Sequence, residues 1–491
     1  MLKTRNHLLL ICLTLLSSCL SMTQKEISEN VLELPSLAVS AKQAISSSFL
    51  KEGGWPDKVW WETFEDSKLN ALMQKALEQN PSIQSVERKV EFAKQNAIVV
   101  RSKLYPLVFF DYKDTWSYLS HNGIYRGLNP NIPLNGNLTD LSLSFTYELD
   151  FWSKYRNLFR SALGKVKADE AEAEQVKLTT TTALAQAYFA LKTNLIKKKL
   201  YSELKDTQQS ILDLQIVMKD KALYSILPPL SGAESLQEVK QQLIDIEDEV
   251  KFDIHLINTI LGQGPDVDLD IDDELKHLPE QLTIPTTLSL DLLSRRPDLM
   301  AQIWTVESLA REVGAAKADF YPNINLAGLF GYESFFVSNL LTASSQNQSL
   351  IPALNLPIFT AGAIRANIRA KKASFDQAVF NYNQKILDST KEVADLLVIA
   401  RSVYEKKQLQ DDVVLEAKKI YDINSLLYTS GLDSLFSLYS SRLNLLQKQI
   451  QDVGLLYNQY LAAIKLIKSL GGGYTSEFLP IKAMGVTADA K

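Results

Sequence analysis

Residue types that commonly perform chemistry are few and scattered in this sequence of 491 residues. The four histidines stand far apart, and no His-Glu-x-x-His motif or cysteine pair accompanies them to bind zinc. Five aspartates between Asp266 and Asp273 have the spacing that begins a calcium loop, but Ile271 and His277 occupy the positions that need Gly and Glu. A Gly-rich phosphate loop and a Gly-x-Ser-x-Gly motif are both absent. The sequence therefore predicts neither an enzyme nor a metal or cofactor site.

Cys19 is the cysteine with a predicted chemical role. A short basic stretch precedes the apolar run 8–16, which is too short to span a bilayer and is typical of a cleaved export signal. Leu16-Ser17-Ser18-Cys19 resembles the bacterial lipobox, whose cysteine is acylated and becomes the first mature residue. Acyl chains would anchor the protein in a membrane, at about 0.8 kcal/mol per buried CH₂. Cys12 is lost with residues 1–18, so no disulfide is expected; an ordinary signal with a chance cysteine is the alternative.

Composition excludes several classes of protein. The formal charge of −5 and the lack of a basic stripe argue against a partner made of nucleic acid. Gly and Pro together make roughly 7% of the chain, where ~12% is usual. Few turns therefore interrupt the chain, and long regular elements are expected rather than disorder or a disulfide-dense scaffold.

One pattern occurs twice in the sequence. Asn80-Pro81 opens a helical stretch that ends at Tyr105-Pro106, and Arg296-Pro297 opens another that ends at Tyr321-Pro322. The distance from proline to proline is 25 residues in both copies. Proline suits the first position of a helix, and a second proline stops it, so each copy predicts one bounded helix.

Each bounded helix is followed by a predicted β-hairpin, at 105–150 in the first copy and 321–358 in the second. Apolar residues alternate with polar ones along each strand, and loops at 120–137 and 334–348 split the pairs. The fourth strand is the weakest, with Leu350, Leu354, Leu356 and Ile358 as its apolar face. Strands of ~10–12 residues with one apolar face have the pattern of bilayer-spanning strands. A soluble sheet with one buried face is the alternative.

Four strands cannot close a barrel by themselves. An open edge in lipid leaves backbone groups unpaired at several kcal/mol each, and the smallest single-chain bacterial barrels need eight strands. The sequence therefore predicts an oligomer in which each chain supplies two hairpins to a common wall.

Long helices follow the hairpins. Residues 153–223 and 361–427 contain no proline, so each stretch can extend for roughly 100 Å as a helix. Steps of four and three residues predict left-handed coiled-coil packing. The apolar seam of the second long helix runs through Phe375, Val379, Tyr382, Ile386, Val393, Leu396, Ala400 and Val403. The seam at 236–260 in the first copy has Asp253 as its exception.

Several of these segments resemble one known family, the TolC-like outer-membrane efflux channels, in their OprM-type lipoprotein branch. The matching motifs are Trp60-Trp61-Glu62-Thr63-Phe64, Leu292-Leu293-Ser294-Arg295-Arg296-Pro297-Asp298-Leu299, Ala318-Asp319-Phe320-Tyr321-Pro322, Leu356-Pro357-Ile358-Phe359-Thr360-Ala361-Gly362 and Tyr428-Thr429-Ser430-Gly431-Leu432-Asp433-Ser434. The resemblance implies an α+β membrane protein that forms a homotrimer. Its 12-stranded barrel would lie in outer-membrane lipid and continue as a 12-helix periplasmic tunnel that docks a periplasmic adaptor and an inner-membrane pump of the resistance-nodulation-division (RND) type.

The repeats and the resemblance together predict a division of the chain into six parts. These are a lipoprotein signal at 1–18, an N-terminal anchor and equatorial segment at 19–79, a first repeat at 80–264, a solvated acidic linker at 265–295, a second repeat at 296–471 and a tail at 472–491.

The resemblance also assigns functional positions. The turn at 222–232, with Tyr224 and Ser225, and the turn formed by Tyr428, Thr429, Ser430, Gly431, Leu432, Asp433 and Ser434 would be the periplasmic tips that contact the adaptor. Phe436 and Ser440 fall where the family often has a hydrophobic ring and an aspartate ring. Phe436 also lies on a heptad seam, so core packing is the alternative to a gate. Because Ser440 is not acidic, we expect weaker cation selectivity than in an aspartate-gated relative.

Two other functions remain open at this point. The channel could serve a type I protein-secretion pump, or the long helices could form a structural lipoprotein without a pore. Single-channel conductance would separate a duct from a spacer. The sequence does not specify the substrate, the adaptor or the pump.

Overall fold

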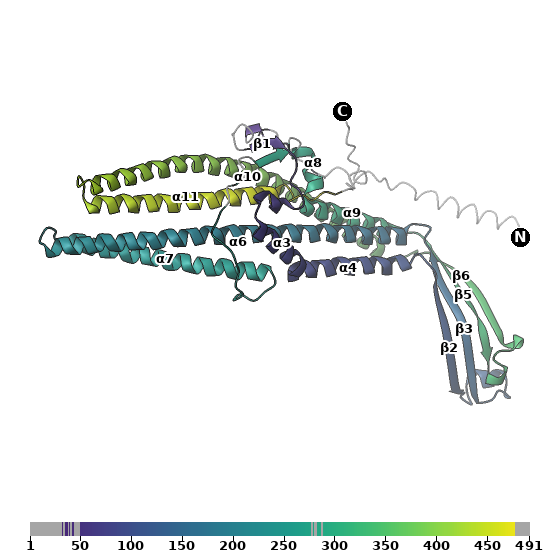
Figure 1. Ribbon diagram of the computed structural model, residues 1–491. Helices are drawn as coiled ribbons and strands as arrows, with labels where there is room; N and C mark the ends of the chain where they lie inside the picture. The colour runs from purple at the N-terminus through teal and green to yellow at the C-terminus, as the bar shows by residue number, and fades with distance from the viewer. Residues whose placement is uncertain are drawn as a thin grey trace.

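A computed structural model describes residues 50–476 except 276–277, 279–281 and 286–287, together with residues 32, 35–37, 39 and 42–43. Cys19 and the predicted signal lie outside the described residues, as does the chain beyond residue 476. The molecule is a long rod of helices with a β-sheet at one end, set at an angle to the helical shaft (Figure 1).

The shaft is built from two sets of helices. The first set is α3 (Ser67–Gln79), α4 (Pro81–Ser102), α6 (Lys154–Asp220) and α7 (Leu227–Ile260); the second is α8 (Leu288–Arg295), α9 (Pro297–Ala318), α10 (Ala363–Thr429) and α11 (Leu435–Ser469). Helices α4, α6 and α7 lie within the first predicted copy and α9, α10 and α11 within the second, while α3 and α8 precede those copies. A proline occupies the first turn of both α4 and α9. The long helices α6 and α10 contain 67 residues each, so each extends for roughly 100 Å, as the sequence predicts. The hairpins α6–α7 and α10–α11 run side by side (Figure 1).

Helix α6 is the centre of the shaft. It contacts α4, α7, α9 and α11, whereas α10 contacts α9 and α11. The seam predicted for α10 is buried, since Val379 and Ile386 are at most 2% exposed and pack in one cluster with Leu299 and Ile303 of α9. A second cluster joins the short helix Trp60–Phe64 to α6 and α11, where the ring of Phe189 stacks on that of Tyr460 at 4.1 Å. These clusters hold the two copies together as one wall.

The sheet contains four antiparallel strands in the order β2-β3-β5-β6. Their bounds are β2 (Leu107–Tyr118), β3 (Asn135–Leu149), β5 (Asn323–Ser334) and β6 (Gln346–Asn355). The prediction that Leu356 and Ile358 belong to the fourth strand is wrong. The β5–β6 ladder ends at the pair Asn323–Asn355 because β5 begins directly after Pro322. Strands β2 and β6 are the two edges of this sheet.

Short helices lie within the loops of the two β-hairpins. They are α5 (Ile124–Leu128) between β2 and β3, and the 3₁₀ helices η3 (Val337–Asn339) and η4 (Ala343–Ser345) between β5 and β6. Along the described chain no helix combines the length and the apolar character that crossing a membrane requires.

The segment expected to be a solvated acidic linker is partly ordered against the shaft, which corrects the interpretation of the sequence. Asp272 lies 3.0 Å from the ammonium of Lys192, whose side chain is only 4% exposed, and Asp273 forms an ion pair with Lys199. A buried ammonium needs carboxylate partners, so these acidic residues are held at the surface of α6. Further along, β4 (Leu282–Pro285) pairs in parallel with β1 (Leu50–Gly53), a contact that the sequence did not predict.

Candidate functional site

The turn between α10 and α11 is a capped helix-to-helix connection. Tyr428 and Thr429 end α10, while Ser430, Gly431, Leu432, Asp433 and Ser434 form the turn. Gly431 has a φ of 71°, and the N–H of Leu432 donates to the carbonyl of Leu427 at 2.9 Å, which caps the last turn of α10. The hydroxyl of Ser434 then accepts a hydrogen bond from the N–H of Ser437 at 3.2 Å and starts α11. Asp433 is partly exposed, and its pKa is lowered by the hydrogen bond from the backbone N–H of Ser434.

The turn between α6 and α7 has the same backbone design with different residues. Ala222 takes the left-handed position with a φ of 58°, and the N–H of Leu223 donates to the carbonyl of Met218 at 2.9 Å. Tyr224 and Ser225 follow in the turn, and α7 already begins at Leu227. The turn predicted at 222–232 is therefore shorter than expected, because Pro228 and Pro229 lie in the first turn of α7, where a missing N–H is tolerated.

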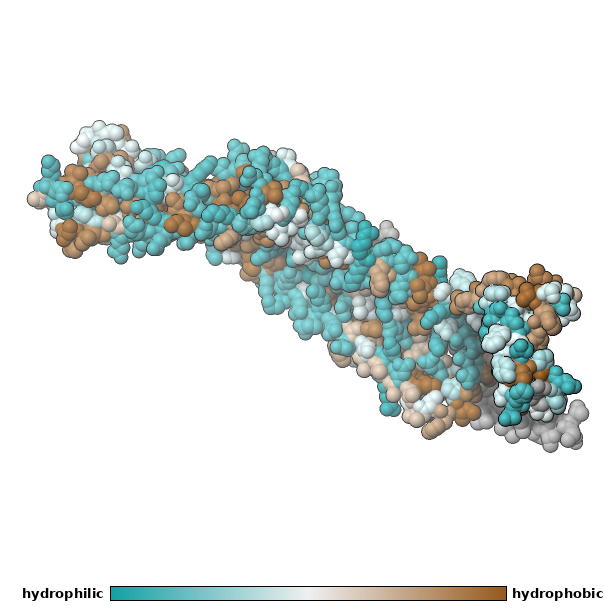
Figure 2. Space-filling view, turned by 90° about the horizontal axis from the view of Figure 1, so that it is seen from below, coloured by the Kyte–Doolittle hydropathy of each residue, from teal (hydrophilic) through white to brown (hydrophobic). Residues whose placement is uncertain are grey.

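The two tips differ in chemistry. Around the first, Leu223, Ile226 and Leu227 are 54–70% exposed, whereas the second presents Ser430 and Asp433 next to Leu432. Figure 2 shows hydrophilic residues along much of the shaft, with hydrophobic patches near the helical tips and at the strand end. The two predicted tips thus lie together at the end of the shaft opposite the sheet (Figure 1).

The candidate aperture residues lie on the first turns of α11. Phe436 is 38% exposed and Ser440 is partly buried, while Leu446 further along the same seam is fully buried. Further along α11, the guanidinium of Arg442 lies 5.3 Å from the ring centre of Tyr421 and forms an ion pair with Glu203 of α6. No local sequence signal predicts this link between the two helical hairpins, because its partners are more than two hundred residues apart in the chain.

The Arg-Arg-Pro-Asp motif joins three helices at the middle of the shaft. Arg296 forms two hydrogen bonds with the carboxylate of Asp298, at 2.9 and 3.0 Å, and a third with Glu392 of α10 at 2.8 Å. Burial alone would raise the pKa of Asp298, but the hydrogen bonds and charge of Arg296 outweigh it and lower that pKa. Such a bidentate pair fixes the orientation of both side chains. The motif therefore fixes α9 and α10 relative to each other.

Asp66 is the centre of a second buried cluster of hydrogen bonds, which was not predicted from the sequence. One carboxylate oxygen caps α3 by accepting from the N–H groups of Lys68 and Leu69. The other accepts from the hydroxyl of Tyr188 at 2.8 Å and the ammonium of Lys192 at 2.9 Å. Burial alone would raise the pKa of Asp66, but these hydrogen bonds lower it by more. The pKa of Asp66 therefore lies below its ordinary value. An aspartate directly before the helical residue Ser67 was the available sequence signal.

The register of the sheet separates an apolar face from a polar face. Phe110, Leu143 and Phe330 lie side by side on one face of β2, β3 and β5. On the other face, Lys113 lies opposite Asp140, which in turn lies opposite Glu333. In a membrane barrel the apolar face contacts lipid and the polar face lines the lumen. Among the residues that the structure describes, no group of three or more His, Cys, Asp or Glu side chains is placed to bind a metal.

Comparisons with known proteins agree with this architecture. The chain is 28% identical over 440 residues to the putative multidrug resistance outer membrane protein MdtQ of Shigella flexneri, covering 86% of this chain and 89% of that protein. The fold matches the outer-membrane channel OprN with a TM-score of 0.79 at 21% identity, covering 93% of this chain and 100% of that one. It matches the Campylobacter jejuni CmeC outer membrane channel with a TM-score of 0.78 at 22% identity, covering 89% and 92%.

The structural matches show a shared fold, a helical barrel wall with a β domain. The family model described as outer membrane efflux protein matches residues 72–247 and 288–472, which is well over half of the chain. The matched residues include both β-hairpins and both helical tips. The chain belongs to the outer membrane efflux protein family.

Proposed function

We propose that three copies of this chain form the exit duct of a tripartite multidrug efflux system. Each copy would supply four strands to a 12-stranded outer-membrane barrel and four helices to each level of a 12-helix periplasmic tunnel. The observation that carries the proposal is the joining of two helical hairpins of roughly 100 Å to an open four-stranded sheet at one end.

The sheet supports the trimeric arrangement. Strands β2 and β6 have free edges, and unpaired edge groups cost several kcal/mol each in lipid. Residues on the apolar face of β2 are also exposed in the single chain, with Val108, Phe110 and Tyr112 at 62–68%. Pairing β2 of one copy with β6 of the next satisfies the edges and leaves that apolar face toward lipid.

The helical tips are the proposed docking surface for a periplasmic adaptor. They lie at the far end of the shaft from the sheet, so they are the part of the chain that reaches deepest into the periplasm. The adaptor would connect the duct to an inner-membrane pump of the RND type. The tip at Gly431 and Ser430 offers a polar contact, and the tip at Ala222 and Leu223 offers an apolar one. In a trimer these two kinds of contact would alternate around the end of the tunnel.

Acylation of Cys19 is the proposed second membrane attachment. The lipobox-like sequence at 16–19 supports it, and the strand β1 begins only some thirty residues later at Leu50. A lipid anchor beside the barrel would hold the N-terminal segment at the inner surface of the outer membrane.

Reconstitution tests the duct directly. Purified protein in planar bilayers should give discrete single-channel conductance. A bifunctional thiol-reactive crosslinker should give covalent trimers with the variant S117C/N347C, which has one cysteine on each edge strand. The matched variant S430C, at the tip, should conduct equally and give no edge-to-edge crosslink. Absence of both conductance and trimers would favour the spacer alternative.

Cells test the efflux role. A strain lacking its own outer-membrane duct should become less sensitive to small toxic compounds when this chain is expressed with its adaptor and pump. Restored export of a secreted protein, without any change in drug sensitivity, would instead favour a type I secretion duct.

A further inference from the structure

The helices between the sheet and the middle of the shaft form a row with the same order as the strands. Helix α4 contacts α6, α6 contacts α9, and α9 contacts α10. The sheet has the order β2-β3-β5-β6, and the chain joins β2 to α4, β3 to α6, β5 to α9 and β6 to α10 (Figure 1). Helices α4 and α10 therefore lie at the two ends of the row, as β2 and β6 lie at the two edges of the sheet.

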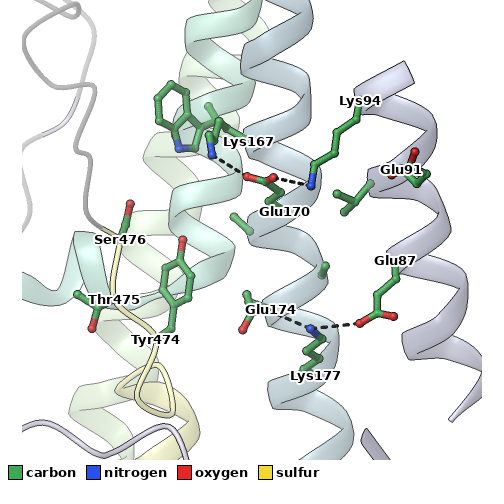
Figure 3. A pocket seen from close by; sticks show the side chains of 14 residues that line it. Glu87, Glu91, Lys94, Lys167, Glu170, Glu174, Lys177, Tyr474, Thr475 and Ser476 are labelled. Atoms are coloured by element: carbon green, nitrogen blue, oxygen red, sulfur yellow. Dashed lines mark hydrogen bonds and ion pairs between the residues drawn. The ribbon is translucent and has the colours of Figure 1, made fainter. Parts of the chain in front are cut away.

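One side of α4 is occupied by α6. Lys94 of α4 lies 3.2 Å from Glu170 of α6, and Glu87 lies 3.3 Å from Lys177 (Figure 3). The apolar residues on this side of α4 are buried, namely Val86, Val90, Ala93 and Ala97. This side of α4 therefore has its partner within the chain.

The opposite side of α4 is apolar and uncovered. Phe92 stands two residues after the buried Val90, which is about half a helical turn away around the axis. Its side chain is 73% exposed, and Val99, two turns further on, is exposed on the same side. Ile98 next to it is exposed as well. The single chain thus leaves an open apolar surface on α4.

Helix α10 has an uncovered side of the same kind. Phe380 is 60% exposed, and Leu387, seven residues later, is also exposed. Ala373 and Ala366 continue this line in steps of seven and are exposed. Steps of seven residues keep side chains on one side of a helix. These four residues form the exposed line of α10, separate from the buried seam that contacts α9.

The internal repeat indicates what these two surfaces fit. Helices α6 and α10 have the same length, and the left-handed residues Ala222 and Gly431 stand at the same distance beyond their ends, so the two helices align residue by residue. Helices α4 and α9 are also equal in length, and each begins with a proline. The contact of α6 with α9 inside the chain is therefore the template for a contact of α10 with α4. Because α4 and α10 end the row at opposite sides, that contact needs a second copy.

The template contact is close. A Cβ on Gly164 of α6 would lie 3.0 Å from the Cβ of Ser308 of α9. A Cβ on Gly314 of α9 would lie 3.1 Å from the side-chain nitrogen of Asn157 of α6. The hydroxyls of Ser161 and Ser308 are 3.0 Å apart. Small and polar residues thus join α6 to α9.

The matching positions at the ends of the row are complementary in size. Phe92 and Ile98 of α4 stand where α9 has Ser308 and Gly314. Ala373 and Ala366 of α10 stand where α6 has Gly164 and Asn157. Large apolar side chains on α4 would therefore meet alanines on α10.

We propose that Phe92 of one copy packs against Ala373 on the exposed line of α10 in the next copy. The inference rests on the proposed trimer and deepens it by naming the helix contact that joins the copies next to the barrel. This contact is apolar, because the template's ion pair between Lys165 and Glu312 has Ser374 and Asn96 at the matching positions. The same head-to-tail contact, repeated three times, closes a ring and covers both exposed surfaces.

Disulfide trapping tests the contact in the full-length protein. In F92C/A373C the two Cβ atoms of neighbouring copies should approach to about 4 Å, so mild oxidation should give covalent trimers on non-reducing gels. F92C/F380C is the matched control. Phe380 lies about 10 Å further along the same side of α10, which is too far for a disulfide, so this variant should give no covalent trimer. Equal trapping in both variants, or a disulfide within one chain, would overturn the proposal.

The same experiment separates this inference from the proposed duct. Trimers of S117C/N347C without trapping of F92C/A373C would show that the strands pair between copies and that the α4–α10 contact is wrong. Absence of trimers in both variants would overturn both proposals. Protection of F92C from maleimide only after addition of an adaptor would assign this surface to the adaptor and would also overturn the contact.

A size exchange tests the packing itself. F92A leaves a cavity and A373F overfills the contact, so each should weaken the association of copies in detergent about tenfold. The double variant F92A/A373F should restore most of the association, measured as the fraction of trimer by size-exclusion chromatography. Both side chains are exposed in the single chain, so the circular dichroism of all variants should be unchanged. Losses that simply add in the double variant would show that the two residues do not meet.

Discussion

Asn80 and Arg296 perform the same task in the two repeats, each donating a side-chain hydrogen bond to the last residue of the returning helix in its own repeat. The amide of Asn80 reaches the carbonyl of Ile260 at 2.7 Å, and the guanidinium of Arg296 reaches the carbonyl of Ser469 at 3.0 Å. Ile260 ends α7 and Ser469 ends α11. The final carbonyls of a helix lack hydrogen-bond partners within that helix. An asparagine in the first repeat and an arginine in the second therefore supply the missing donor.

Asn80 also caps the next helix, which makes its two functions separable by mutation. Its carbonyl oxygen accepts from the N–H groups of Ser82 and Ile83. The variant N80A loses the cap and leaves the buried carbonyl of Ile260 unpaired, so we expect a loss of about 2 kcal/mol in the free energy of unfolding. N80D keeps the cap but cannot donate, and should lose about half as much.

Urea denaturation followed by circular dichroism measures these differences. R88A, at an exposed position of α4, is the control and should unfold like the unmodified protein. Equal losses for N80A and N80D would show that the cap contributes nothing.

Local rules predicted the regular elements well, because the signals were local. Prolines mark the starts of α4 and α9, and the heptad spacing identifies the buried seam of α10. The missed features depend on contacts between distant segments. The pair β1–β4 joins residues more than two hundred positions apart, and the partners of Lys192 lie on α3's cap and in the acidic segment.

The backbone conformation of the first tip could not be predicted from its residue type. Gly431 signals a left-handed cap by its identity, whereas Ala222 has the same conformation without that signal. The sequence therefore made the two turns look different, although their capping hydrogen bonds are equivalent.

Exchanging these two residues should have opposite effects on stability. A222G removes the strain of a side chain at φ 58°, so we expect it to stabilise the protein by up to about 1 kcal/mol. G431A introduces that strain at φ 71°, in a place where nothing lies within 4 Å of the added methyl, and should destabilise by about 1 kcal/mol. Thermal denaturation of both variants provides the comparison.

Gly454 offers the matched control. It lies inside α11, also with open space around it, and has no left-handed conformation. G454A should therefore stabilise the protein by about 0.5–1 kcal/mol through helix propensity. If G431A behaved like G454A, the assigned backbone of the second tip would be incorrect.

Asp253 interrupts an apolar seam and should make stability depend on pH. Burial raises its pKa to about 6, helped by the charge of Glu249 and opposed by a hydrogen bond from Asn194 at 2.9 Å and by Lys197. Tyr457 of α11 lies at the same pocket. Because the folded protein holds this proton more tightly than the unfolded chain, stability should fall as pH rises from about 4 to 6 and then level off.

The variant D253N should remove that fall and be more stable at pH 7.5, by about 1 kcal/mol after allowance for partial exposure. Urea midpoints at several pH values would measure it. D245N, at an exposed position of the same helix, is the control and should keep the original pH profile. An unchanged profile in D253N would assign the pH dependence to another group.

Ion selectivity should be set in the barrel more than at the tips. Ser440 leaves the aperture without an acidic ring, but the polar face of the sheet places Asp140 between Lys113 and Glu333 and adds Asp111 on β2. Three carboxylates against one ammonium give each copy a net negative lumen surface there, and rings of acidic residues favour cations. The conducting channel should therefore prefer cations in spite of Ser440.

Reversal potentials in a KCl gradient across planar bilayers separate the two locations. The double variant D140N/E333Q should move the reversal potential toward zero, whereas S440D should move it further toward the cation limit. D114N is the control, because Asp114 lies on the apolar face and accepts a hydrogen bond from Thr139 at 2.9 Å that asparagine can keep. If only S440D changed the reversal potential, the tip aperture would control selectivity and the barrel charges would be too well screened to matter.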